Sequence, residues 1–258
     1  MCRLGAYIGP AISLQAFLIE PPHNLIKQSW APKEMAEAVL NADGFGFGWY
    51  SDINDPMTYL NTLPIWSDIN LESLARSLRS EVWLGCVRSA TPGQMTALNN
   101  TQPFRFGKLL FVHNGYIKNF SKTCKPGFNE FLEPGVRAEI NGNTDSEYIF
   151  AVFRQMLRQS SQDIASAINQ TVNEITRLAG DTPVLMNCII SNGDSVYAVR
   201  HAVNSQSPSL YYSGNPDSLA GGKLVASEPF NENDDWQTFP DSHILTLSRS
   251  GEHRWMSV

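Results

Sequence analysis

The chain has 258 residues, of which 42% are hydrophobic and 17% charged, and its formal net charge is −6 at pH 7. A chain of this length and composition folds as one large domain or two small ones, and its negative charge argues against a nucleic-acid-binding surface. No apolar run approaches the roughly 20 residues of a membrane span, and the N-terminus does not resemble a secretion signal. We therefore expect a cytoplasmic protein that binds neither a nucleic acid nor a membrane.

The first half of the chain is predicted to form mainly strands. Alternating or continuous apolar residues predict strands at residues 3–9, 44–50, 57–63, 82–88 and 108–114. Between the third and fourth of these, residues 71–78 place their apolar side chains on one helical face.

Two longer helices are predicted next. Within residues 143–160, Thr144 and Glu147 have the spacing of a capping box, and apolar side chains follow on a common stripe. Residues 164–178 repeat apolar side chains at steps of three and four. After them, strands are expected at residues 184–191, 195–202, 209–214, 223–227 and 243–248. This order predicts a single α+β domain over residues 1–258, with helices packed on antiparallel sheets.

Cys2 directly follows the first methionine, and its thiol has two interpretations. It is either a small apolar residue that begins a strand or, once Met1 is removed, a residue with both a thiol and a free α-amine. The amine has a reference pKa of about 7.7–8.0, so near neutral pH it accepts the thiol proton. The two groups together form a nucleophile with its own base. The remaining cysteines, Cys86, Cys124 and Cys188, are far apart, which favours free thiols.

The sequence VHNGYI at residues 112–117 contains a candidate oxyanion hole. The side-chain amide of Asn114 and the backbone N–H of Gly115 supply two neighbouring donors for a developing negative charge. Glycine also allows a substrate to approach the main chain closely. The alternative interpretation is an Asn-Gly hairpin turn after an apolar strand.

Two charged residues are candidates for binding an amino-acid substrate. Arg88 ends an apolar strand, where its guanidinium can bind a carboxylate at two points, or alternatively form an ion pair within the protein. Asp145 lies in the first turn of a predicted helix, where it complements the helix dipole and can equally bind an α-ammonium group. Together with Cys2 and the Asn114-Gly115 pair, they describe a site for a γ-glutamyl amide.

These motifs, in this order, resemble the class II glutamine amidotransferases, a family of N-terminal-nucleophile hydrolases. The resemblance rests on Cys2, on Arg88 and Thr91 in VRSAT, on Asn114-Gly115 in HNG, and on Asp145 in TDSE. It implies a four-layer αββα sandwich with Cys2 as the catalytic nucleophile. It also implies that Asn114 and Gly115 form the oxyanion hole, while Arg88, Thr91 and Asp145 bind the substrate.

Longer fragments are similar to one branch of this family, the ergothioneine-pathway hydrolases. They include PPHNLIKQSWAP, NADGFGFGWY, PIWSDINLESLARSLRS and ASEPF. This similarity implies hydrolysis of γ-glutamyl-hercynylcysteine sulfoxide with release of glutamate. If the leaving group carries a trimethylammonium, an aromatic wall would suit it, and Trp30, Trp49 and Trp66 are candidates unless they belong to the core.

The sequence departs from the family pattern near the substrate amide. Ser89 and Pro92 stand where many members have an aromatic residue and a histidine, and Gln102 stands where relatives commonly have histidine. Fewer side chains are therefore expected to close over the γ-amide, which is compatible with a leaving group larger than ammonia.

Three alternative functions share the same motifs. One is an amidase for glutathione-like γ-glutamyl peptides, and another is a glutaminase subunit that delivers ammonia to a separate synthase. The third is a γ-glutamyl-binding module that has lost catalysis. No group of His, Asp or Glu has metal-ligand spacing, so no metal or other cofactor is expected.

Overall fold

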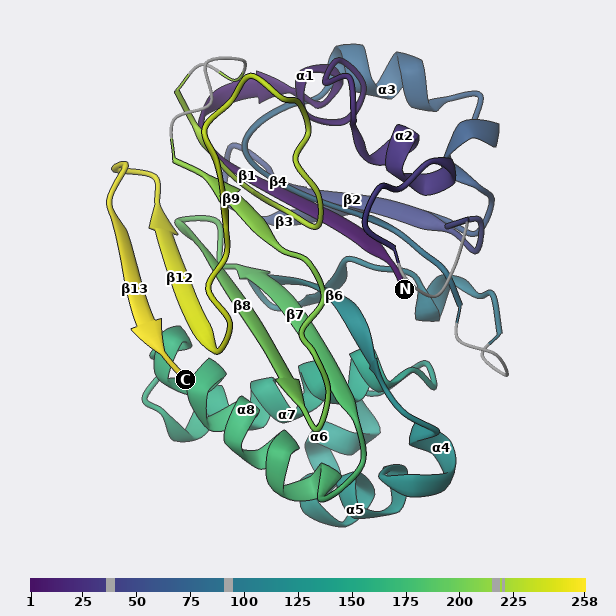
Figure 1. The fold of residues 1–258 in the computed structure, drawn as a ribbon, viewed down its shortest axis with the longest axis vertical. Helices are drawn as coiled ribbons and strands as arrows, with labels where there is room; N and C mark the ends of the chain where they lie inside the picture. The colour runs from purple at the N-terminus through teal and green to yellow at the C-terminus, as the bar shows by residue number, and fades with distance from the viewer. Residues whose placement is uncertain (36–39, 91–94, 215–218, 220) are drawn as a thin grey trace.

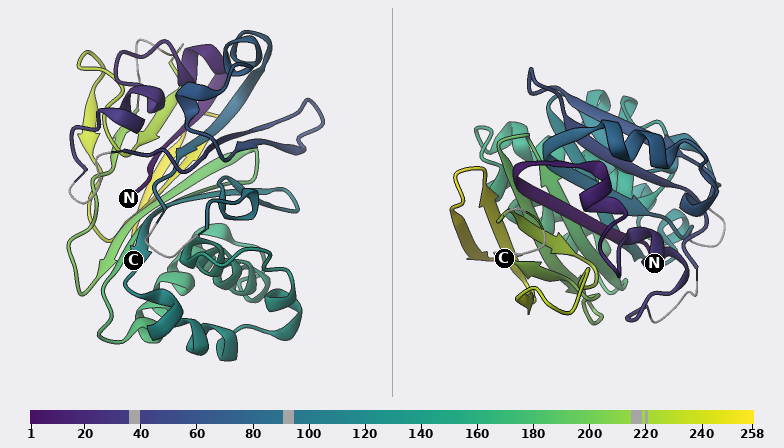
Figure 2. Two further views of the ribbon diagram at one scale, coloured as in Figure 1. Left: turned by 90° about the vertical axis from the view of Figure 1, so that its right-hand side faces the viewer. Right: turned by 90° about the horizontal axis from the view of Figure 1, so that it is seen from above.

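Two antiparallel sheets lie face to face between two layers of helices (Figure 1). The structure is a computed structural model that describes residues 1–35, 40–90, 95–214, 219 and 221–258. Figure 2 shows the same arrangement from the side, with one group of helices above the sheets and the other below them. The predicted α+β class and the four-layer αββα sandwich are therefore confirmed.

The first sheet has seven strands in the order β11-β9-β10-β1-β4-β2-β3. Its central strand is the first of the chain, which pairs with β10 on one side and with β4 on the other. The strands of this sheet are β1 (Arg3–Ser13), β2 (Phe45–Tyr50), β3 (Pro56–Asn61), β4 (Arg79–Val87), β9 (Tyr211–Ser213), β10 (Lys223–Ala226) and β11 (Trp236–Thr238).

The second sheet has six strands in the order β13-β12-β8-β7-β6-β5. Neighbouring strands in this sheet are antiparallel, and four of the five pairings join strands that follow each other in the chain. Its strands are β5 (Phe104–Phe106), β6 (Leu109–Ile117), β7 (Val184–Ser191), β8 (Ser195–Val203), β12 (His243–Ser248) and β13 (His253–Ser257).

The helices form the two outer layers. Those on the first sheet are α1 (Leu14–Leu18), α2 (Leu25–Trp30) and α3 (Leu71–Ser77). Those on the second sheet are α4 (Phe120–Thr123), α5 (Lys125–Phe131), α6 (Pro134–Ala138), α7 (Asp145–Gln159) and α8 (Ile164–Ala179). Two short 3₁₀ segments, Ile65–Ser67 and Leu98–Asn100, complete the described helices. Within the described ranges, no helix combines the length and the apolar character that a bilayer crossing requires.

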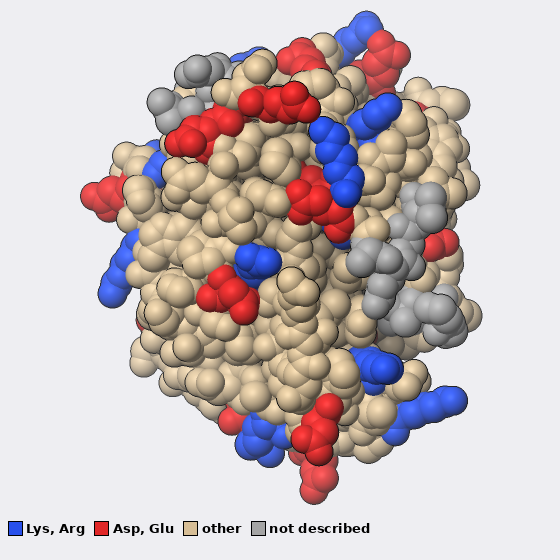
Figure 3. Space-filling model, in the orientation of Figure 1, with Lys and Arg blue, Asp and Glu red and all other residues tan. Residues whose placement is uncertain are grey.

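Three apolar cores hold the four layers together. The cluster between the sheets contains Leu4, Val112 and Val225, whereas a second cluster packs Tyr7 and Phe17 beneath the helices of the first sheet. The third cluster packs the second sheet against α7 and α8. On the face shown in Figure 3, acidic and basic side chains are interspersed over a mostly uncharged surface.

Alternation along β1 places neighbouring residues in different cores. Leu4, Ala6 and Ile8 point between the sheets, whereas Tyr7 points toward the helices of the first sheet. The strand continues past Pro10 to Ser13, with a register shift between Ile8 and Ile12. This alternation decides which side of the sheet each residue near the chain start can reach.

Candidate active site

Cys2 directly precedes β1, and its side chain lies on the face that looks into the space between the sheets. Arg3 pairs with Val87 of β4, and Leu4 pairs with Cys86, so Cys2 and Cys86 share this face in neighbouring strands. Cys2 is 8% exposed and belongs to the inter-sheet core. Its Sγ lies 4.0 Å from the carbonyl oxygen of Ser89, the second residue after the end of β4.

The surroundings of Cys2 favour its thiolate. A hydrogen bond from the Cys86 thiol lowers the pKa of Cys2 to about 6, in spite of burial, which acts in the opposite direction. The positive charges of the chain terminus and of Arg88 lower the pKa of Cys2 further. The pKa of Cys86 is raised well above its usual range, by the same hydrogen bond and by burial. Cys86 therefore stays protonated and donates, and the thiolate forms at Cys2.

Asn114 lies in the middle of β6, paired with Asn187 of β7, and not in a turn. The hairpin alternative for the Asn-Gly pair is therefore wrong. Asn114 is fully buried, and its Nδ2 donates a hydrogen bond of 3.3 Å to the Oγ of Ser227. The same Oγ accepts from the backbone N–H of Leu4 at 3.0 Å, so one hydroxyl joins Asn114 to the strand that begins beside Cys2.

Gly115 is required by the neighbouring strand. A Cβ at this position would lie 1.8 Å from the carbonyl oxygen of Leu185 and 2.7 Å from the Nε2 of His113. Both atoms belong to the protein, so the close approach that needs glycine here is between β6 and β7. The strand pairing alone thus accounts for glycine at position 115.

Arg88 directly follows β4, as predicted, and is 3% exposed. Its Nη1 donates to the carbonyl oxygen of Asp43 at 3.3 Å, and its Nη2 reaches that of Met95 at 3.5 Å. Its backbone is held as well, because its N–H donates to the carbonyl of Gly44 at 2.8 Å. The guanidinium is therefore fixed beside the end of β4. Arg88 also directly precedes Ser89, whose carbonyl contacts Cys2.

Asp145 is the first residue of α7 and is 4% exposed. Its Oδ2 accepts a hydrogen bond of 2.7 Å from the N–H of Ile117, at the end of β6, and its Oδ1 accepts one of 2.9 Å from the N–H of Ser146. The carboxylate thus caps the helix and fixes the helix start to β6. The predicted cap Thr144 also forms, through a bond of 3.2 Å from the N–H of Glu147.

A hydrogen-bonded path connects the start of α7 with Arg88. Asn143 N–H donates to the Oδ1 of Asn100 at 3.1 Å, and the Nδ2 of Asn100 donates to the carbonyl of Met95 at 2.9 Å. That carbonyl also faces Arg88. Cys2 and Arg88 therefore lie at the same end of the first sheet, and Asn114 is connected to β1 through Ser227. The segment before Asp145 is connected to the Arg88 contact through Asn100. Thr91 and Pro92 lie outside the described residues.

Sequence reasoning missed two buried side chains that support these positions. Gln102 bonds both backbone groups of His113, accepting from its N–H and donating to its carbonyl at 3.2 Å, so it fixes the residue before Asn114. Ser227 fixes the amide of Asn114 itself. The sequence singled out Gln102 as a departure from the family pattern and placed Ser227 in the ASEPF fragment, but it gave the partners of neither, because those partners are far away in the sequence.

The three candidate tryptophans differ in their surroundings. Trp30 and Trp66 are each 45% exposed, so the core interpretation is wrong for both. The Lys27 Nζ lies 3.7 Å from the centroid of the Trp30 ring. Trp49 is half-buried and packs against Phe47. The Trp30 ring therefore already contacts a cation, the ammonium group of Lys27.

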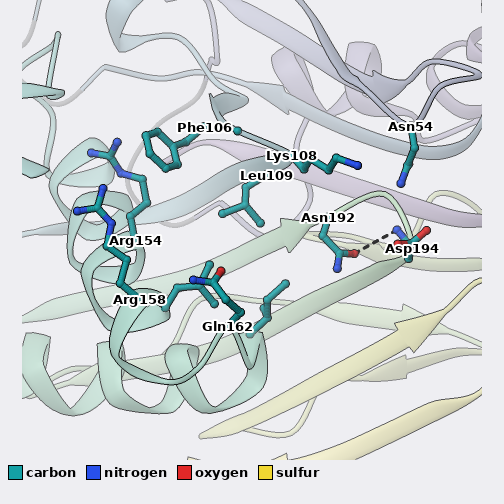
Figure 4. Close-up of a pocket in the computed structure, with 12 residues that line it drawn as sticks. Asn54, Phe106, Lys108, Leu109, Arg154, Arg158, Gln162, Asn192 and Asp194 are labelled. Atoms are coloured by element: carbon teal, nitrogen blue, oxygen red, sulfur yellow. Dashed lines mark hydrogen bonds between the residues drawn. The ribbon is translucent and has the colours of Figure 1, made fainter.

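Two of the cavities in the described part of the structure lie away from the predicted site residues. One of about 440 Å³, shown in Figure 4, is lined by Arg154 and Arg158 of α7 and by residues of the β5–β6 and β7–β8 turns. It contains none of the predicted site residues. Another of about 730 Å³ is lined by His23, Lys33 and Glu228. Within the described ranges, no three His, Cys, Asp or Glu side chains gather as metal ligands.

The sequence is similar to one family of known proteins. A model of the class-II glutamine amidotransferases matches residues 26–212, which is more than half of the chain. The chain is 29% identical over 247 residues to the γ-glutamyl-hercynylcysteine sulfoxide hydrolase of Mycolicibacterium smegmatis, covering 96% of each protein. It is 28% identical to a probable glutamine amidotransferase of Saccharomyces cerevisiae, covering 96% of this chain and 82% of the yeast protein.

The fold agrees with that assignment. A solved glutamine aminotransferase class-II domain protein from Silicibacter pomeroyi superimposes with a TM-score of 0.72 at 23% identity, over 99% of both chains. The family match contains Arg88, Asn114, Gly115 and Asp145, and it begins after Cys2. The family match and the shared fold together show that this chain belongs to the class-II glutamine amidotransferases, a family of enzymes.

Proposed function

We propose that the protein hydrolyses the γ-glutamyl amide bond of a small molecule and releases glutamate, with Cys2 as the nucleophile. The observation that carries this proposal is the buried Cys2 thiol, whose pKa is lowered to about 6. This pKa applies with Met1 in place and gives a thiolate at neutral pH, which is the reactive form of cysteine. It faces the space between the sheets, into which Asn114 also points.

The chemistry requires that Met1 is removed, so that the α-amine belongs to Cys2. The thiolate attacks the γ-carbonyl carbon, and the negative oxygen accepts hydrogen bonds from Asn114 Nδ2 and the Gly115 N–H. One Nδ2 hydrogen is directed at Ser227, which leaves the other for the oxyanion. The α-ammonium then protonates the departing amine as the C–N bond breaks. Water, deprotonated by the α-amine, attacks the resulting thioester and restores the thiolate.

The glutamyl part of the substrate is proposed to bind between Arg88, Thr91 and Asp145. Arg88 is buried and keeps its guanidinium plane fixed, which suits the α-carboxylate. Each oxygen of Asp145 accepts one backbone hydrogen bond and retains a second lone pair for the α-ammonium group. The α-carboxylate and the α-ammonium group of the glutamyl part would thereby each bind a side chain of opposite charge.

The names of the relatives favour one leaving group. The relative from Mycolicibacterium smegmatis is named a γ-glutamyl-hercynylcysteine sulfoxide hydrolase, and its similarity extends over 96% of both proteins. We therefore propose this sulfoxide as the substrate. The yeast relative is named a probable glutamine amidotransferase, which supports glutamine hydrolysis as the second candidate function.

Glutamate release by the purified protein tests the proposal. The substrates are γ-glutamyl-hercynylcysteine sulfoxide, glutathione and glutamine, and intact mass shows whether Met1 is absent. Cys2→Ala is expected to abolish release, whereas Cys188→Ala, which removes a buried free thiol from the other core, is expected to retain it. Activity in Cys2→Ala, or no release from any of the three substrates, would contradict the proposal.

A further inference from the structure

Arg3 is a fully buried arginine on the face of β1 opposite to Cys2. Its side chain lies on the helix side of the sheet and turns back, so that its Nε donates a hydrogen bond of 2.8 Å to the carbonyl oxygen of Cys2. Its Nη1 donates to the Oε1 of Glu228 at 3.2 Å, and the two side chains form a buried ion pair. One planar guanidinium therefore connects the Cys2 backbone to Glu228.

Glu228 is fully buried and is itself held by several donors. Its carboxylate accepts the N–H groups of Lys33 at 2.8 Å and Glu34 at 3.1 Å, and it contacts the Nε2 of His23 at 2.7 Å. Although burial opposes ionisation, these hydrogen bonds and the Arg3 charge keep the pKa of Glu228 below its usual value. A carboxylate with this many partners has little freedom to move, so it provides a rigid anchor for Arg3.

Ser227 and Glu228 are consecutive residues that act on opposite faces of the same sheet. The hydroxyl of Ser227 reaches the inter-sheet side, where it bonds Leu4 N–H and Asn114. Glu228 reaches the helix side, where it bonds Arg3. The first residues of β1 are thus held from both sides by one short segment after β10.

We propose that Arg3 and Glu228 are positioning residues that fix the Cys2 nucleophile for attack, an inference that rests on the proposed function. Cys2 precedes the first residue of β1, so the strand ladder begins only at Arg3. After removal of Met1, a single peptide bond would attach Cys2 to the protein. Holding its carbonyl oxygen fixes the plane of that bond, and with it the direction in which the thiol and the α-amine project.

The proposed role of the Arg3–Glu228 pair is geometric. The Arg3 charge also interacts with Cys2, so a test of the geometry has to keep both charges of the pair. The hydrogen bond from Nε, in contrast, depends on the planar fork of arginine, and lysine cannot bond the Cys2 carbonyl and Glu228 in the same way. A misplacement of about 1 Å is sufficient to slow an enzymatic reaction by about 10²-fold.

Two variants that conserve charge test this inference, Arg3→Lys and Glu228→Asp. Turnover of γ-glutamyl substrate is expressed per reactive Cys2, which is counted by iodoacetamide labelling and mass spectrometry. We expect kcat per labelled site to fall by about 10²-fold, with KM within about threefold of its wild-type value. The pH at which Cys2 labelling is half-maximal is expected to stay unchanged, because the charge balance is kept.

The matched control is Glu139→Gln, which removes the partner of the buried Arg154 in the other helix layer. This variant should lower the unfolding temperature without changing kcat per labelled site. Wild-type kcat per site in Arg3→Lys and Glu228→Asp, or unfolding of both, would show a purely structural pair and overturn the inference. Cys2→Ala, measured alongside, separates this result from a failure of the proposed function, because an active Cys2→Ala protein would contradict that function first.

Discussion

The side-chain amide of Asn114 and the hydroxyl of Ser227 lie 3.3 Å apart across the inner faces of the two sheets. This bond joins the middle of β6 to the segment after β10. Because the hydroxyl also accepts from Leu4 N–H at 3.0 Å, the distance between the proposed nucleophile strand and the proposed oxyanion donor is fixed by a single oxygen atom.

Replacement of Asn114 tests the oxyanion role. Asn114→Ala removes one donor to the developing negative charge, so we expect kcat to fall by about 10²–10³-fold. The control is Asn187→Ala, because Asn187 pairs with Asn114 in the sheet but donates to the carbonyls of Pro208 and Ser209. The kcat of each variant is measured by steady-state glutamate release. An equal loss of kcat in both variants would argue against an oxyanion hole at Asn114.

Removal of the Cys86 thiol should raise the pKa of Cys2. In the wild type, the folded pKa of Cys2 is about 6, below its unfolded value, so thiolate reactivity and its contribution to stability are lost as the pH falls through about 6. Cys86→Ala deletes the donor that lowers this pKa most, and the half-maximal pH of Cys2 labelling by iodoacetamide is expected to move upward. A midpoint still near 6 would assign the lowered pKa to the neighbouring positive charges and the Ser89 carbonyl instead of the Cys86 thiol.

Substitution of Gly115 should destabilise the fold. An alanine Cβ would lie 1.8 Å from the carbonyl oxygen of Leu185, so β6 and β7 would have to separate locally. We expect Gly115→Ala to lower the free energy of unfolding by at least about 1–3 kcal/mol in urea denaturation. Gly135→Ala, where no atom lies within 4 Å of the added Cβ, is the control and should not destabilise. An unchanged stability for Gly115→Ala would mean that the strands adapt without strain.

Replacement of Arg88 should affect substrate binding more than turnover. Arg88→Lys keeps a charge but loses the planar fork, so KM is expected to rise by about 10-fold or more while kcat changes less. Arg79→Lys, at the opposite end of β4, changes an exposed arginine whose Nη2 donates to the Ala11 carbonyl, and it should leave KM unchanged. A fall in kcat at constant KM would assign Arg88 to the transition state instead of the α-carboxylate.

The sequence predicted the long elements well because their patterns are strong. The expected helices at residues 143–160 and 164–178 correspond to α7 (Asp145–Gln159) and α8 (Ile164–Ala179), and the strands at 184–191 and 243–248 have the observed bounds. The missed elements include α1, α2, β5 and β11, which have three to six residues. Segments this short carry too few periodic residues for a pattern and are stabilised by their tertiary contacts.

The predicted site was recognisable because its motifs are local. Asn114-Gly115 and Thr144-Asp145 are each adjacent pairs, and Arg88 ends a strand that the apolar pattern reveals. Glu147 shows the limit of local reasoning, because its carboxylate bonds the N–H groups of Asn141 and Gly142 instead of returning to the Thr144 N–H. The partners of Ser227 depend on the pairing of β1 with β10, which no local pattern specifies.

The pairing of β1 with β10 also determines when, during synthesis, the first residues of the chain can be held in place. Gly5 of β1 pairs with Ala226 of β10, so the central strand of the first sheet acquires its second neighbour only after most of the polypeptide has left the ribosome. Contacts of such large sequence separation form late in folding. A chain that ends before residue 227 lacks Ser227 and Glu228, and with them the hydrogen bonds to the Leu4 N–H and the Arg3 side chain. We expect such unfinished copies to lack the fixed nucleophile that the proposed function requires.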